Sequence, residues 1–176
     1  MTISPPPDPY DEPVRHLNAR RRLYELNPGP ATRADLADAL AFDAAYTVRS
    51  VWSDARQVDV VLRDGGRFGP RPTFAELRSP GAVLVAPTQL RSLWPEDGRA
   101  LTDALQSLYA AVELVGRDGG GPESWAARFA AASAAQAAAG RPWSIAALAD
   151  HPGRYTLTLP PPRRPAAPGQ ASRGAS

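Results

Sequence analysis

The chain has 176 residues, among them 20 arginines and 18 acidic residues, and its net charge is +2. It contains no cysteine, which excludes disulfides, zinc fingers, iron–sulfur clusters and thiol nucleophiles. It contains no lysine either, so a Schiff-base lysine, a pyridoxal-phosphate anchor and a Walker-A phosphate site are excluded, because a guanidinium cannot replace the amine.

Both ends of the chain are rich in proline and predict disorder. Residues 1–12 are acidic, residues 160–176 carry three arginines, and neither composition can bury a core. We expect one globular domain at residues 13–159, made of a unit at 13–72 and a helical unit at 73–159. This body carries 17 arginines against 15 acidic residues, which is not the basic footprint of a DNA-binding domain.

The sequence lacks membrane and export signals. No apolar run has the length of a membrane span, and residues 1–12 have neither the basic start nor the apolar centre of a signal peptide. We therefore expect a cytoplasmic protein.

The N-terminal half predicts helices followed by a hairpin. Residues 13–26 and 32–41 have helical periodicity, with Thr32 as the N-cap of the second helix. Phe42 falls at a predicted turn, after which Asp43 caps a third helix. Residues 57–63 alternate as a half-buried strand, and Asp-Gly-Gly at 64–66 predicts a tight hairpin turn.

This order of elements resembles that of a winged helix-turn-helix domain. The resemblance implies a recognition helix at residues 44–55 and a wing at 57–68. The side chains that it would place on DNA are Arg20, Arg21, Arg22, Tyr46, Arg49 and Arg67. The alternative is a structural module of three helices and a hairpin without a DNA role, and the balanced charge favours this alternative.

The C-terminal half predicts mainly helix. A capping-box pattern at Thr73 indicates a short helix, and residues 81–86 form an apolar run typical of a buried strand. Further helices are expected at residues 89–94, 95–115, 123–139 and 142–148, and a last strand at 154–159. The predicted fold class is therefore α+β, predominantly helical, with a winged-helix-like N-terminal unit packed against a helical half that carries one or two strands.

The helix at residues 95–115 has a heptad-like apolar seam. The seam consists of Leu101, Leu105, Leu108 and Val112. Such a seam faces either the protein's own core or a partner helix, so it is also a candidate interface.

Signals for catalysis are few. His151 follows Asp150, but the chain has no G-x-S-x-G motif. Its two histidines are far apart in sequence and the glycines at 119–121 lack a phosphate-binding motif, so we expect no metal and no cofactor. The sequence favours a non-catalytic protein that binds another protein or a second copy of itself. The alternatives are a DNA-binding regulator and an enzyme that uses His151 with a carboxylate.

Overall fold

The computed structural model describes residues 11–116 and 124–162. In these residues the chain forms four α-helices, two 3-10 helices and one five-stranded antiparallel sheet, which confirms the α+β class. The connection at 117–123 lies outside the described residues. So do the tails predicted to be disordered, except for residues 11–12 and 160–162. Pro160, predicted to begin the C-terminal tail, is instead buried in the folded body.

Two long helices form the N-terminal part. Helix α1 (Asp11–Leu26) packs along α2 (Pro30–Val51). Gly29 is the N-cap of α2, and Thr32 lies three residues further on. The Thr32 hydroxyl accepts a hydrogen bond from the Gly29 amide at 3.0 Å and donates one to the Asn27 carbonyl at 2.7 Å. Thr32 therefore stabilises the helix start from within the first turn, not from the N-cap position predicted for it.

The predicted turn at Phe42 and Asp43 is wrong, because α2 continues through it without a break. No glycine or proline occurs between residues 31 and 51, and the alanines of this segment favour helix strongly. Asp43 does not cap a new helix. Its carboxylate accepts a hydrogen bond from the Ser107 hydroxyl at 3.1 Å, and burial raises its pKa. One continuous helix replaces the helix-turn-helix.

The sheet contains strands from both ends of the chain. The strands are β1 (Gln57–Arg63), β2 (Arg71–Arg78), β3 (Val83–Val85), β4 (Ser144–Ala147) and β5 (Arg154–Thr158), in the spatial order β3-β2-β1-β5-β4. A hairpin after β1 is confirmed, but the tight turn predicted at residues 64–66 is wrong. A short 3-10 helix, η1 (Gly66–Phe68), lies in the connection, and the return strand is β2. Because β1 lies between β2 and β5, the two halves of the chain share one sheet.

Two segments predicted to be helical are strands. The segment that begins at Thr73 belongs to β2, which pairs with β1 over the whole length of that strand. Residues 144–147 form β4, which pairs with β5. In both segments the backbone hydrogen bonds of an adjacent strand outweigh a local pattern of capping or helical residues.

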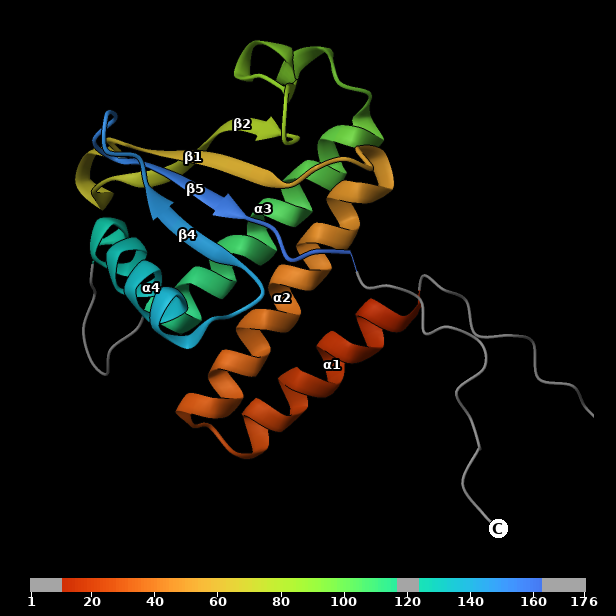
Figure 1. Ribbon diagram of the computed structural model, residues 1–176, viewed down its shortest axis with the longest axis vertical. Coiled ribbons are helices and arrows are strands. Elements are labelled where there is room, and N and C mark those ends of the chain that lie inside the picture. Colours follow the sequence, from red (N-terminus) through yellow and green to blue (C-terminus); the bar gives the residue numbers. More distant parts are fainter. Residues whose placement is uncertain (1–10, 117–123, 163–176) are drawn as a thin grey trace, which may run out of the picture.

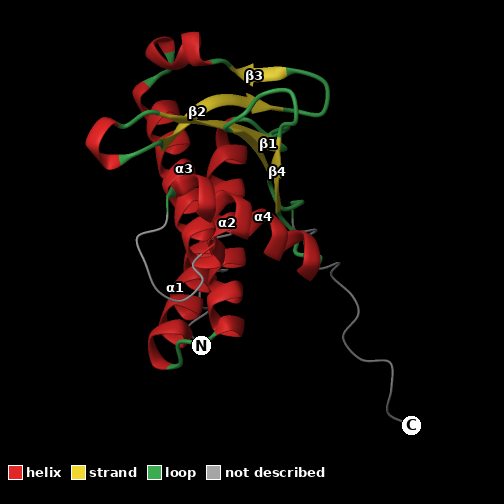
Figure 2. Ribbon diagram, turned by 90° about the vertical axis from the view of Figure 1, so that its left-hand side faces the viewer, coloured by secondary structure: helices red, strands yellow, loops and turns green. Residues whose placement is uncertain are grey.

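The α-helices cover one face of the sheet. Helix α3 (Pro95–Gly116) packs against both α2 and α4 (Trp125–Ala139), and all three lie on the same side of the strands (Figures 1 and 2). The core between the layers contains Val58, Val60 and Leu157 of the sheet and Leu108 and Val112 of α3. No α-helix in the described part of the chain lies over the opposite face, which we call the open face; the 3-10 helix η2 (Pro87–Ser92) flanks it beside β2.

Candidate functional site

Alternation along the strands assigns each side chain to one face of the sheet. In the pairing of β1 with its neighbours, Asp59 lies opposite Glu76 and Thr156, and Val61 lies opposite Arg154. Their sequence neighbours Val58 and Val60 are buried in the core, so the alternate residues lie on the open face. The charged side chains of this face are Asp59, Arg63, Arg71, Glu76, Arg78 and Arg154.

Asp59 is fully buried, although it belongs to the open face. Its carboxylate accepts hydrogen bonds from the Thr156 hydroxyl at 2.6 Å and from Nη2 of Arg154 at 3.0 Å. Nη1 of Arg78 lies 3.7 Å from the same carboxylate. A buried carboxylate is tolerated only when it is paired and hydrogen-bonded. These partners come from β2 and β5, so Asp59 links the three central strands.

Arg154 extends this cluster to a second carboxylate. Its Nη2 lies 3.2 Å from Oε2 of Glu76, and its side chain is 25% exposed. Two arginines, Arg78 and Arg154, therefore balance two carboxylates, Asp59 and Glu76. We conclude that the cluster holds the sheet together and contributes no net charge to the open face.

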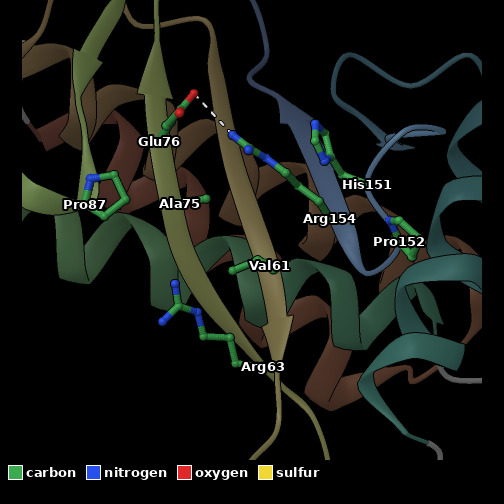
Figure 3. Close-up of a pocket in the computed structure, with 8 residues that line it drawn as sticks. All are labelled: Val61, Arg63, Ala75, Glu76, Pro87, His151, Pro152 and Arg154. Carbon is green, nitrogen blue, oxygen red and sulfur yellow. Dashed lines mark ion pairs between the residues drawn. The ribbon is translucent and has the colours of Figure 1, made fainter.

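A groove of about 390 Å³ lies beside this cluster. Its lining residues are Val61, Arg63, Ala75, Glu76, Pro87, His151, Pro152 and Arg154. Figure 3 shows Val61 in the middle of the groove, with the rings of Pro87 and Pro152 on opposite sides of it. Arg63 lies at one end and the Glu76–Arg154 ion pair towards the other. The groove thus has an apolar centre and a cationic end.

The wall that contains His151 is held by the turn between β4 and β5. The Leu148 amide donates to the Arg154 carbonyl at 3.0 Å, and the Leu62 amide donates to the Gly153 carbonyl at 2.8 Å. Gly153 has a φ of +77°, a conformation that glycine adopts without strain. These bonds fasten the turn to β1, so the wall keeps its position relative to the sheet.

The opposite wall begins at Pro87, the first residue of η2. The Ala86 amide donates to the side-chain oxygen of Gln89 at 2.7 Å, and the Gln89 amide donates to the Ala86 carbonyl at 3.0 Å. This reciprocal pair satisfies the backbone at the start of η2. On the floor, Ala75 is the extra residue of an irregularity in β2, since Glu76 and Phe74 pair with the consecutive residues Asp59 and Val60.

Two arginines face each other at the cationic end. Arg63 of β1 lies directly opposite Arg71 of β2, and both are exposed. Among the contacts of the described residues, Arg63 has no hydrogen bond and no ion pair. Like charges directly opposite each other on adjacent strands destabilise a sheet. This end of the groove therefore carries the positive charge of Arg63, which forms no ion pair with a carboxylate of the described residues.

The side chains predicted to contact DNA do not form a common surface. Arg20, Arg21 and Arg22 lie on α1, far from the hairpin turn that carries Arg67 (Figure 1). Arg20 forms an ion pair with Asp35 at 3.4 Å. Tyr46 is on α2 and is 36% exposed.

Arg49 is engaged inside the molecule. Its Nε donates to the Ala55 carbonyl at 3.0 Å and its Nη1 to the Pro160 carbonyl at 2.7 Å. Burial, together with repulsion from Arg56, lowers its pKa below the ordinary value of an arginine. The guanidinium joins the end of α2 to the chain that follows β5, so it is not available to read DNA.

The apolar seam of α3 belongs to the core. Leu101, Leu108 and Val112 are buried, and Leu105 is partly buried against the same core. The packing partners of α3 are α2 and α4 of the same chain. The seam therefore offers little surface to a partner, and we do not propose it as an interface.

His151 is exposed and lines the groove together with Glu76. No hydrogen bond or ion pair of the described residues joins His151 to a carboxylate, and Glu76 points to Arg154 instead (Figure 3). In the described ranges, no group of three or more His, Asp or Glu side chains could hold a metal ion. No helix in those ranges is both long enough and apolar enough to cross a membrane.

Comparison with protein-family models, with curated protein sequences and with solved structures gave no match. Function is therefore inferred from the open face itself.

Sequence reasoning missed the groove, although part of its signal is present in β1. The alternation of residues 57–63 predicted that Asp59, Val61 and Arg63 share one face of a strand, and this prediction is confirmed. The other half of the site comes from Arg154 and from the wall at His151, about ninety residues later in the chain. Recognising that these segments are adjacent requires the pairing of β1 with β5.

Proposed function

We propose that this protein is non-catalytic and that it binds another protein through the open face of its sheet. The observation that carries the proposal is the groove, in which an apolar centre at Val61 and Ala75 lies next to the exposed guanidinium of Arg63. Recognition surfaces commonly combine a small apolar contact area with a few polar anchors. The helices cover the other face, so the open face is where the sheet can accept a ligand.

Catalysis by His151 is less well supported by the same groove. A general base needs a free proton-accepting group within hydrogen-bond reach of its substrate. Two carboxylates of the open face, Asp59 and Glu76, both accept contacts from Arg154. His151 has no carboxylate partner among the described residues that would orient its ring. DNA binding is also less well supported. The helix-turn-helix is replaced by the continuous helix α2, and Arg49 is engaged internally.

Site-specific photocrosslinking in the cells that make the protein tests the proposal. A photoreactive amino acid would replace Thr73, an exposed residue of the open face opposite Val61. The matched control would replace Asn18, an exposed residue of α1. We expect the Thr73 position to give a discrete protein adduct that the Asn18 position does not give. Equal adducts from both positions, or adducts with nucleic acid in place of protein, would contradict the proposal.

A further inference from the structure

We infer that helix α4 blocks strand addition by a second copy of this protein at the β4 edge of the sheet. Two side chains of α4, Ser133 and Gln136, occupy backbone carbonyls of that edge. The inference concerns the edge of the sheet and is independent of the groove on the open face. It predicts that the protein self-associates through β4 when the two side chains are removed.

The first step is the direction of the backbone groups of β4. This strand lies at one end of the sheet, next to β5. Beyond the last paired residues, the Leu148 amide donates to the Arg154 carbonyl at 3.0 Å. Hydrogen-bonded and non-bonded pairs alternate along an antiparallel ladder, so the even-numbered residues of β4 bond to β5 and the odd-numbered residues direct their backbone groups outwards. Outward backbone groups at a sheet edge are a template for pairing with another chain.

The second step is that α4 engages two of these outward carbonyls. The Ser133 hydroxyl donates to the Ile145 carbonyl at 2.8 Å, and the Gln136 side-chain amide donates to the Trp143 carbonyl at 3.3 Å. Helix α4 packs directly beside β4 (Figure 1). Gln136 is only 4% exposed, and burial of a polar group costs free energy unless the group is hydrogen-bonded. A second strand would have to displace these side chains before it pairs with β4.

The composition of α4 sets the same two residues apart. From residue 130 to residue 139 the helix consists of alanine except at Ser133 and Gln136. Alanine has the highest helix propensity, so helix formation alone does not explain the two exceptions. They lie three positions apart, which places them on one side of the helix, and both contact β4. Their shared role is therefore at the edge of the sheet.

The two edges of the sheet are protected in different ways. At the other edge β3 is three residues long, prolines lie near both of its ends, and its pairing with β2 is irregular. Short length, proline and irregular pairing all discourage strand addition. β4 contains neither a charge nor a proline, and its exposed residues are Ser144, Ala146 and Ala147. The contacts of α4 take the place of those protections at β4.

A second copy is the partner that fits the edge once it is open. In two β4 strands related by a twofold axis, each strand meets the same uncharged residues of the other. No like charges come face to face there, and the antiparallel sheet continues from one copy into the next.

Sedimentation velocity over a range of protein concentrations tests the inference. The test variant carries Ser133→Ala and Gln136→Leu, which remove both donors. The matched control is Ser107→Ala, which removes a serine hydrogen bond from α3 to Asp43 of α2. We expect the mean mass of the test variant to rise to about twice that of the original protein. The control should have the same mass as the original protein at every concentration.

A further substitution shows whether β4 is the surface that associates. Ala146→Lys, added to the test variant, places a charge at an exposed position of the strand, and charge at an edge opposes strand pairing. We expect it to restore the mass of the original protein. Circular dichroism measures whether each variant is folded, and association caused by unfolding would persist with Ala146→Lys.

Equal masses of the test variant and the original protein would overturn the inference, and so would association that Ala146→Lys does not reverse. If the test variant does not fold, Ser133→Ala alone is measured in the same way. A smaller rise in mass is then expected, and an unchanged mass would overturn the inference. Crosslinking from Thr73 tests the proposed function separately, because Thr73 lies on β2.

Discussion

Arg49 illustrates how one side chain can look like a DNA contact in the sequence and be structural in the fold. The resemblance placed it on a recognition helix, whereas its guanidinium binds the carbonyls of Ala55 and Pro160. Its Nη2 is buried without a hydrogen-bond partner among the described residues, and burial lowers its pKa. Both features oppose burial of the charge, so the two carbonyl bonds must offset them.

Replacement of Arg49 should therefore cost stability. We expect Arg49→Ala to lower the free energy of unfolding by about 2–3 kcal/mol, because it breaks two charged hydrogen bonds and leaves two carbonyls to find other partners. Urea denaturation followed by circular dichroism measures the change. As the control, Arg22→Ala at an exposed position should stay within about 0.5 kcal/mol of the original protein. Equal effects of the two substitutions would show that Arg49 is not a structural link.

For the buried carboxylate Asp59, one property could be predicted from the sequence and another could not. Alternation in β1 predicted the face of the strand on which it lies. Its burial could not be predicted, because its hydrogen-bond partner Thr156 is 97 positions away in the chain. The local pattern determines the direction of a side chain, whereas the neighbours that cover it depend on which strands pair.

Among the secondary-structure elements, those with a regular apolar pattern, such as α3 and β5, were predicted correctly, whereas α2, β2 and β4 were misassigned from local helix-start signals. Helix α3, of 22 residues, was predicted within one residue of its observed end, because its apolar periodicity is regular from Leu101 to Val112. The segments that became β2 and β4 are short, and their local patterns favoured helix. The four residues of β4 are held by pairing with β5, a partner that local sequence does not reveal.

The junction of α3 and α4 gives a test in which helix propensity and packing predict opposite results. A Cβ at Gly116 would lie 2.3 Å from the backbone oxygen of Arg128, whereas a Cβ at Gly98 of the same helix would meet nothing within 4 Å. Alanine is favoured over glycine in helices by about 1 kcal/mol, but overpacking costs roughly 1–3 kcal/mol. We expect Gly116→Ala to lower the melting temperature and Gly98→Ala to leave it unchanged or raise it, measured by thermal denaturation. Stabilisation by both substitutions would contradict the close approach of the two helices.

For the whole molecule, the helices on one side of the sheet leave the other side as the main candidate for recognition. The sequence predicted the α+β class and favoured a protein partner, but it directed attention to the seam of α3. The seam proved to be core. Among the tryptophans, Trp143 is buried, whereas Trp94 is 72% exposed. Trp94 and Leu26, which is 75% exposed, remain competing positions at which a partner could bind.

Hydroxyl-radical footprinting of the protein, with and without the partner identified through Thr73, compares these surfaces directly. Oxidation is read at His151 on the groove wall and at Trp94 and Leu26 outside the groove. If the open face is the binding surface, the partner will protect His151 several-fold and leave Trp94 and Leu26 as reactive as in the free protein. Protection of Trp94 or Leu26 with His151 unchanged would contradict this account.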